Sequence, residues 1–292
     1  MADKLYKRKV RLVISSPVSS NYHETTRDEL EITAQRVAFK IEFKDSKEPN
    51  ASEVSVYGLN KDSRAIIQKK GNKVILEAGY EDTGLSRIFI GDVRIGDNKK
   101  SVAEWISTMK LGDGERAYRN ARVNQSFSPG TTAGDVLDYL ADASGLQVGN
   151  VPKKLLDLTQ TYDQGYSIGG KWSDEMTRFC RSVGYVWSIQ HQTLQVLLPG
   201  QAVNQDGLIP ELSADSGLIE TPEFGTPEKK GQPFTLKFKS LLRPVQVGAV
   251  LRLKSRAHDG EVLVKKASVT GDTHGGDWYV NYEGIIHGDN QS

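Results

Sequence analysis

The chain has 292 residues, a length that suits two domains and a substantial buried core. Its 38 basic and 37 acidic residues leave a formal charge of +1, which argues against the broad basic field of a nucleic-acid-binding protein. Cys180 is the single cysteine, so the chain can form neither an internal disulfide nor a thiol cluster for zinc. This composition fits folding in a reducing cytoplasm.

The N-terminal residues predict neither export nor membrane insertion. A charged start is followed by a short apolar run, Val10–Ile14, without a signal-peptide core or a small-residue cleavage site. No stretch approaches the roughly 20 apolar residues that a membrane helix needs. We therefore expect no export by this route and no membrane anchor.

Residues 1–102 have the pattern of a small β barrel. Apolar and polar residues alternate along the segments, and turn residues separate them at short intervals. A short helix is predicted over Asp62–Lys70, with Asn60 as its cap and Gly71 as its stop. The strands are expected at Val10–Ile14, Leu30–Thr33, Val37–Phe43, Glu53–Tyr57, Val74–Tyr80 and Ser86–Val93.

Residues 103–199 predict a small α+β module. A capped amphipathic helix is expected between Thr132 and Gly145, and a second helix between Ser173 and Gly184. Two apolar runs within Tyr185–Leu198 flank a Gln-His-Gln turn and predict a β-hairpin.

The remainder of the chain predicts a linker followed by a second β barrel. Residues 200–231 are rich in Gly, Pro, Ser and acidic residues, as in an extended surface segment. Residues 232–292 contain four further strand patterns. The fold class is therefore mainly β with an α+β insert, in which two small β barrels flank the α+β module. The last four strands are expected at Phe234–Phe238, Ala249–Leu253, Gly260–Val264 and Trp278–Ile285.

Cys180 is expected to be a packed core thiol. It lies on the apolar stripe of the second helix with Met176, Phe179 and Val183. That stripe contains no base or cation that would lower the pKa of the thiol, so a nucleophilic role is not expected.

The histidines do not form a zinc-binding pattern, because they are scattered singly at His23, His191, His258, His274 and His287. His274 is the strongest catalytic candidate, because it lies between two aspartates in the Gly-rich loop Gly271–Trp278. Such a loop could supply a base with its orienting carboxylate, or part of a cation site. A turn between two strands explains the same residues, and we expect the turn.

Ser167 is the second residue whose surroundings resemble a catalytic motif. Gly165–Gly169 matches the Gly-x-Ser-x-Gly pattern of a nucleophile elbow, but no apolar strand precedes it. Gly112–Glu115 fits neither a phosphate loop nor a calcium loop. The sequence therefore assigns no catalytic, cofactor-binding or metal-binding residue, and we expect a structural protein and not an enzyme.

Several segments, taken in order, resemble the baseplate hub proteins of contractile-tailed bacteriophages. Each segment is short, and the likeness depends on their order from about Val37 to Glu283. The segments are Pro49–Leu59, Val74–Tyr80, Ile88–Val93, Gly112–Glu115, Phe127–Ala133, Ser173–Leu197, Ser216–Ile219, Ser240–Pro244 and Gly271–Tyr279.

The resemblance implies a structural subunit of the tail baseplate in a virion, assembled in the host cytoplasm. Such a hub is a homotrimer whose subunits each contribute two barrels similar to tail-tube subunits, so that it adapts a hexameric tube to a trimeric central spike. The implied partners are the tail tube or tube-initiator protein, the spike, the tape-measure protein and other baseplate proteins. DNA would only pass through the channel. For assembly contacts we nominate the loops Ser16–Asp28 and Gly200–Gly231.

Two alternatives remain at this point. The chain could be a distal-tail or tube-initiator protein of another tail-like machine, which subunit symmetry would distinguish. It could also be a cell-wall-degrading enzyme, although the α+β insert uses its polar residues in caps and turns.

Overall fold

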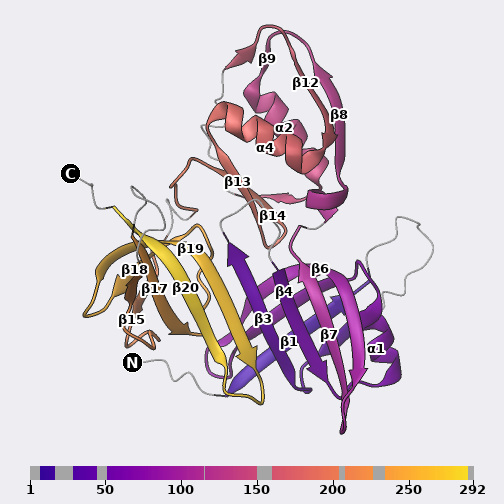
Figure 1. The fold of residues 1–292 in the computed structure, drawn as a ribbon, viewed down its shortest axis with the longest axis vertical. Coiled ribbons are helices and arrows are strands. Elements are labelled where there is room, and N and C mark those ends of the chain that lie inside the picture. Colours follow the sequence, from indigo (N-terminus) through magenta and orange to yellow (C-terminus); the bar gives the residue numbers. More distant parts are fainter. Residues whose placement is uncertain are drawn as a thin grey trace. The chain divides into compact units, whose positions relative to one another are not determined.

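The computed structural model describes residues 7–16, 29–44, 51–114, 116–149, 160–203, 208–225 and 234–288. They divide into two compact units (Figure 1). Unit 1 contains the described residues up to Gly112 and those from Leu208 onward, and unit 2 contains those between Asp113 and Val203. Unit 2 is therefore inserted into the sequence of unit 1.

The first β block of unit 1 contains seven strands and one helix. Strand β3 alternates buried and more exposed residues along its whole length, as its sequence predicts. The helix α1 begins at the predicted cap, where the Asn60 side chain accepts a hydrogen bond from the Ser63 amide. The elements are β1 (Arg8–Ser15), β2 (Glu29–Ile32), β3 (Val37–Lys44), β4 (Ala51–Tyr57), α1 (Lys61–Gln68), β5 (Lys73–Tyr80), β6 (Gly84–Lys100) and β7 (Trp105–Gly112).

The second β block of unit 1 centres on one long strand, β19. Its first half pairs with β18 and its second half with β3, while β20 follows it on the other side. A bulge between Val264 and Lys266 separates the two halves, and bulges of this kind let a strand bend and change register. The strands are β15 (Glu211–Ser213), β16 (Glu223–Gly225), β17 (Thr235–Leu241), β18 (Val250–Lys254), β19 (Asp259–Asp272) and β20 (Trp278–His287).

The pairing of β3 with β19 joins the two blocks in one sheet, and Figure 1 shows these strands side by side. The predicted mainly β class is confirmed. The expected pair of closed barrels is not what the described strands form, because they make one open 13-stranded sheet. Its main path runs β16-β17-β20-β19-β3-β4-β7-β6-β5-β1-β2. Residues 103–112, expected in the α+β module, include β7 of this sheet.

The core of unit 1 is shared by both blocks. One continuous apolar cluster includes Leu12 and Ile41 from the first block and Val264 and Val280 from the second. Each is fully buried, and burial of such a side chain is worth about 1.5–3 kcal/mol. The core is therefore continuous across the junction of the two blocks.

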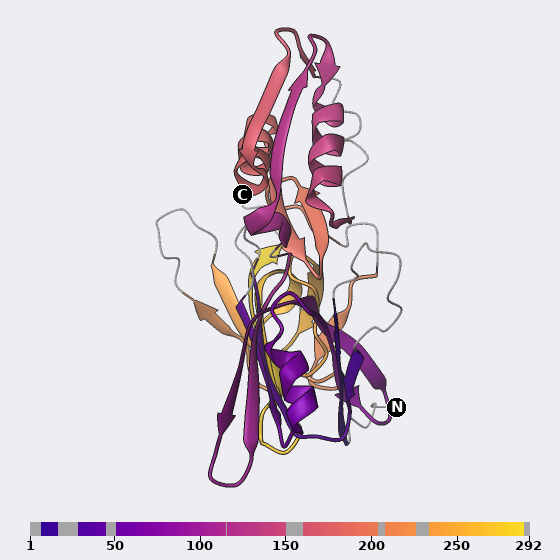
Figure 2. The ribbon, with the colours of Figure 1, turned by 90° about the vertical axis from the view of Figure 1, so that its right-hand side faces the viewer.

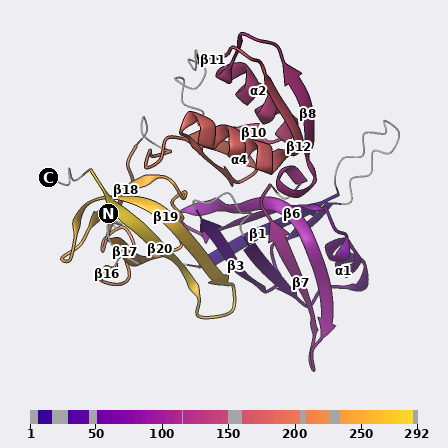
Figure 3. The ribbon, with the colours of Figure 1, turned by 45° about the horizontal axis from the view of Figure 1, so that its top comes forward.

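Strands β6 and β7 form a hairpin whose end extends beyond α1 (Figure 3). The helix lies against one face of the hairpin, where a Cβ atom at Gly96 would stand 2.2 Å from the Ile67 carbonyl oxygen. Glycine is therefore required for this close approach. Asn98 donates a hydrogen bond to the Arg64 carbonyl, and the Arg64 guanidinium lies over the Trp105 ring. These contacts hold α1 on the hairpin.

Unit 2 combines a long two-stranded ribbon, a hairpin and two helices. Figure 2 shows the ribbon β8–β12 with α2 and α4 beside it. The predicted helices are confirmed: Thr132 and Asp135 form a capping box on α2, and Gly145 and Gly184 end the two helices with positive φ. The elements are a π-helical turn (Arg116–Asn120), β8 (Arg122–Phe127), β9 (Thr131–Thr132), α2 (Ala133–Ser144), β10 (Gln147–Val148), β11 (Thr161–Tyr162), β12 (Tyr166–Lys171), α4 (Trp172–Val183), β13 (Val186–Gln190) and β14 (Thr193–Leu197).

The predicted β13–β14 hairpin is confirmed, and a buried carboxylate holds its turn. His191 and Gln192 both have positive φ, a conformation that is strained for residues other than glycine. The Asp113 carboxylate accepts hydrogen bonds from both turn amides, at 2.6 Å from the His191 nitrogen and 2.7 Å from the Gln192 nitrogen. Asp113 is fully buried. The first described residue of unit 2 therefore fixes a turn near the end of that unit.

Two sequence expectations fall partly outside the described residues. These are the loop Ser16–Asp28, of which 17–28 are not described, and the segment Gly200–Gly231, of which 204–207 and 226–231 are not described. Among the helices that the structure describes, none is long and apolar enough to span a bilayer.

We predict that Asp113→Ala destabilises unit 2 by about 1–3 kcal/mol, because it leaves two partly buried amides without their charged acceptor. The backbone amides of β13 and β14 should lose their protection and exchange faster in the variant. Hydrogen exchange followed by mass spectrometry measures this. Asp163→Ala, at an exposed position, is the control and should change stability by less than about 0.5 kcal/mol. Equal effects of the two substitutions would refute the proposed role of Asp113.

Candidate functional site

The loop that contains His274 is held as a turn. The Asp272 carboxylate accepts two hydrogen bonds from Arg36, at 3.1 Å from Nε and 2.7 Å from the terminal nitrogen, and a third from the His274 amide. Thr273 exchanges backbone and side-chain hydrogen bonds with Val37 at the start of β3. Because Asp272 is occupied by Arg36 and by the loop backbone, it does not orient the His274 ring.

Arg8 fixes the same loop from β1. Its guanidinium donates hydrogen bonds to the carbonyl oxygens of Asp272, Gly275 and Gly276, and it lies 5.4 Å from the centroid of the Trp278 ring. Trp278 is buried, and its ring makes edge contacts with Phe39 and Tyr80. Two arginines of the first block therefore clamp the loop between the last two strands.

The electrostatics of Asp272 follow from this clamp. Its pKa is held below the ordinary value of an aspartate, first by the Arg36 hydrogen bond and then by the His274 amide, and burial opposes this lowering. Asp272 therefore stays ionised as a structural acceptor, which is the opposite of what a proton-transferring carboxylate at neutral pH requires.

Ser167 lies within the β8–β12 ribbon, directly opposite Ser126 of β8. Its carbonyl oxygen accepts a hydrogen bond from Arg178, whose guanidinium also lies over the Tyr166 ring. The residue thus lies near the start of a paired strand and not at the sharp turn between strand and helix that a nucleophile elbow needs.

Cys180 is buried, as expected for a core thiol, and lies in the apolar cluster of unit 2 with Met176 and Phe179. Burial raises the pKa of the thiol to about 12. The thiolate is therefore scarce at neutral pH.

The histidines lie apart in the described residues. His191 is in the β13–β14 turn, the His258 ring contacts Phe224 edge-on, and His287 ends β20. His23 falls outside the described residues. In the part of the chain that the structure describes, no group of three or more His, Cys, Asp or Glu side chains could hold a metal ion.

The sheet in unit 1 has a charged face that is a candidate contact surface. Cross-strand neighbours carry alternating charges along one row, from Glu223 through Lys237 and Glu283 to Lys266. A second row places Lys239, Asn281, Ser268 and Glu42 side by side. We call this surface, formed by β3, β19, β20, β17 and β16, the charged face.

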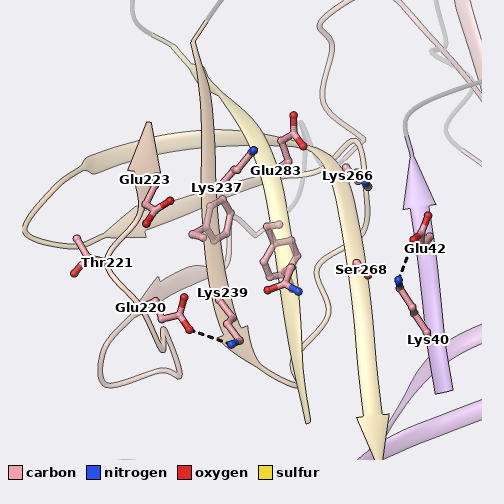
Figure 4. Close-up of a pocket in the computed structure, with 13 residues that line it drawn as sticks. Lys40, Glu42, Glu220, Thr221, Glu223, Lys237, Lys239, Lys266, Ser268 and Glu283 are labelled. Atoms are coloured by element: carbon pink, nitrogen blue, oxygen red, sulfur yellow. Dashed lines mark hydrogen bonds and ion pairs between the residues drawn. The ribbon is translucent and has the colours of Figure 1, made fainter. Parts of the chain in front are cut away.

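A groove of about 410 Å³ lies on the charged face (Figure 4). Its four lysines and four glutamates leave no net formal charge. Two ion pairs bridge neighbouring side chains, Lys239–Glu220 at 3.0 Å and Lys40–Glu42 at 3.7 Å. The hydrogen bond from Lys239 to Glu220 raises the pKa of Lys239. The charged lining residues are Lys40, Glu42, Glu220, Glu223, Lys237, Lys239, Lys266 and Glu283.

The charged face is suited to hydrated contacts with another molecule and not to tight binding of an ion. Exposed ion pairs contribute about 0–1 kcal/mol each, so the rows add little to stability. Neither sign of charge predominates, so the face lacks the concentrated field that binds a polyanion or a cation.

Sequence reasoning missed the charged face and the two clamping arginines. Polar residues at alternate positions, as in Lys40 and Glu42 or Lys237 and Lys239, do indicate a solvated strand face. They do not indicate which strands lie side by side. Arg8 and Arg36 carry no local signal, because a charged residue at a strand start is common on any surface.

Comparison with known proteins finds no matching protein-family model and no matching curated protein. Solved structures do match. The 43 kDa tail protein of prophage MuSo2 from Shewanella oneidensis has a TM-score of 0.63 at 10% identity, over 96% of this chain and 98% of that one. A tail protein from Neisseria meningitidis has a TM-score of 0.63 at 11% identity, over 97% and 98%. The chain has the fold of phage tail proteins.

The fold also occurs in a component of the type VI secretion system from E. coli. A chain of the Francisella PdpA–VgrG complex matches with a TM-score of 0.65 at 8% identity, over 98% of this chain and 59% of that one. The predicted resemblance to phage tail proteins is thus confirmed at the level of the fold.

We predict that Asp272→Asn lowers the melting temperature at neutral pH, because it removes the ionised acceptor of Arg36. The pKa of Asp272 is lower in the folded state, so its contribution is present above the ordinary aspartate pKa of about 3.9 and is lost as the pH falls through the folded value. Melting curves between pH 7 and pH 3 should therefore show the variant and the wild type converging in acid. Asp82→Asn, in an exposed turn, is the control, and a difference independent of pH would contradict this role.

We also predict that the native protein resists thiol reagents at pH 8. Cys180 is 2% exposed, and burial raises its pKa to about 12. Labelling with a chromogenic disulfide reagent should be at least about a hundredfold slower in buffer than in denaturant. Rapid labelling of the folded chain would contradict the packing of α4.

Proposed function

We propose that the chain is a structural subunit of a phage tail or of a related type VI secretion baseplate. The observation that carries this proposal is the match to two tail proteins over nearly the full length of both chains. Because unit 2 interrupts unit 1 in sequence, a match of this extent includes the insertion and not only a common β sheet. Sequence identity of 8–11% supports a shared fold but does not establish shared partners, so the assembly role is our inference.

The more specific role is that of a hub. We propose a homotrimeric ring that adapts a hexameric tail tube to a trimeric central spike. Two β blocks joined in one chain support this role, since three copies of the chain would bring six blocks into a ring. The similarity to a chain of the PdpA–VgrG complex also supports the hub role, because it indicates that tail proteins and a VgrG-containing assembly use the same fold.

The proposed partners are the tail tube or tube-initiator protein, the spike, the tape-measure protein and other baseplate proteins, with DNA only in passage through the channel. The proposed location is the virion tail baseplate, after assembly in the host cytoplasm. The absence of net charge on the charged face supports passage without binding, because a neutral hydrated surface does not retain a polyanion.

A structural and not a catalytic role is part of the proposal. The engagement of Asp272 by Arg36, the position of Ser167 within a paired strand and the burial of Cys180 support it. Incubation with purified cell walls tests this point, and we expect no turnover. Turnover that is abolished by His274→Ala would refute it.

We predict that the purified chain forms a trimer in solution, as measured by light scattering during size-exclusion chromatography over a range of concentrations. The hub role requires threefold symmetry, because the ring must match both the tube and the spike. A hexamer would favour the distal-tail or tube-initiator alternative. A chain that remains monomeric at every concentration would overturn the hub.

A further inference from the structure

The charged face contains a row of four side chains whose charges alternate. Each stands directly opposite the next on a neighbouring strand, and Figure 4 shows them one after another. We call this set the charge row. It ends at β3, where Lys44 lies opposite the last member and pairs instead with Glu42 at 3.8 Å. The members are Glu223 of β16, Lys237 of β17, Glu283 of β20 and Lys266 of β19.

The members of the charge row do not form ion pairs with one another. Directly opposed side chains in an antiparallel sheet have Cβ atoms about 4.5–5.5 Å apart, a separation that long charged side chains can bridge. Among the described residues, none of the four makes an ion pair, whereas Lys239 and Lys40 of the same groove do. All four are exposed or half-exposed. Their charged groups are therefore free to bind a molecule from outside the chain.

The groove over the charge row is elongated across the strands. Its lining includes residues of five strands, but it spans no more than three consecutive positions of any one strand, as in 237–239 and 281–283. Neighbouring strands lie about 4.8 Å apart and a strand rises about 3.3 Å per residue, so the groove extends roughly 19 Å across the strands and roughly 7 Å along them. An elongated occupant therefore lies along the charge row.

The spacing of the charge row favours an α-helix as this occupant. The charges of the row recur at the strand spacing of about 4.7–4.9 Å. A helix rises about 5.4 Å per turn, and residues three or four positions apart on one face are separated by about 4.5–6 Å along its axis. An extended chain presents side chains on one face about every 6.6–6.8 Å, so it falls out of register within the row.

We propose that the charge row binds a partner α-helix, one face of which alternates basic and acidic residues from turn to turn. Lys237 and Lys266 then meet carboxylates of the helix, while Glu223 and Glu283 meet its basic side chains. Exposed ion pairs are individually weak, so this contact selects the order of charges and holds the helix only loosely. The inference goes beyond the proposed function, because it does not depend on the symmetry of the assembly.

Two synthetic peptides test the order of charges. The first is an alanine-based helix of about 18 residues with Lys, Glu, Lys and Glu spaced alternately four and three positions apart. The second has the order Lys, Lys, Glu, Glu and matches only two charges of the row in either direction. We expect the first to bind the purified chain about tenfold more tightly, as measured by fluorescence anisotropy of the labelled peptides at low salt. Added salt should reduce the difference.

A charge exchange in the protein should reverse this preference. Lys237→Glu combined with Glu283→Lys gives a row of two acidic residues followed by two basic ones, and it leaves the net charge unchanged. This double variant should bind the second peptide about tenfold more tightly than the first. The matched control is Arg252→Glu with Glu261→Arg, which exchanges another opposed pair outside the groove and should keep the wild-type preference. Melting curves check that both variants fold, and the wild-type comparison stands by itself if one does not.

A preference that follows the charge exchange supports a helix-binding charge row. Equal binding of the two peptides to the wild type, or a preference that a folded double variant does not reverse, overturns the inference. It is also overturned if a short DNA duplex binds more tightly than the first peptide, or if prolines that prevent helix formation leave the binding of that peptide unchanged. A chain that stays monomeric overturns the hub and leaves this inference intact.

Discussion

The pairing of β3 with the second half of β19 is the constraint on which unit 1 depends. It joins a block near the start of the chain to a block at its end, and it lets both bury their apolar side chains in one cluster. The bulge at Val264–Lys266 makes this possible, because β19 can then pair with β18 through its first half and with β3 through its second half. Arg8 and Arg36 reinforce the junction by binding the loop that follows β19.

This junction also explains why the apparent catalytic loop is structural. Gly271 lies opposite Phe39, and a Cβ atom there would stand 2.3 Å from the Phe39 ring, so the glycine admits the aromatic side chain of β3. Asp272 and Thr273 then bond to Arg36 and Val37. Gly271, Asp272 and Thr273 thus each contact β3 or the residue just before it. The same residue types in an isolated sequence look like a reactive loop.

Local structure could be predicted from the sequence, whereas long-range partners could not. Thr132, Gly145 and Asn60 mark helix ends through interactions with residues a few positions away, and the structure confirms them. The Arg36–Asp272 pair spans 236 positions, and no local signal at either residue specifies the other. The end of the β6–β7 hairpin was also missed, because residues beyond Val93 are mostly polar and a solvated hairpin lacks the apolar alternation that marks a half-buried strand.

The sequence order of unit 1 has a consequence for synthesis on the ribosome. The strand β3 is made early, but its partner β19 emerges only after unit 2 has been translated. Until then, the edge of Val37–Lys44 that will meet β19 is unpaired, and part of its apolar face lacks cover. A nascent chain of this kind cannot present a finished sheet, so subunits can join one another only after β19 has been made. Truncated chains would expose that edge and be prone to aggregate.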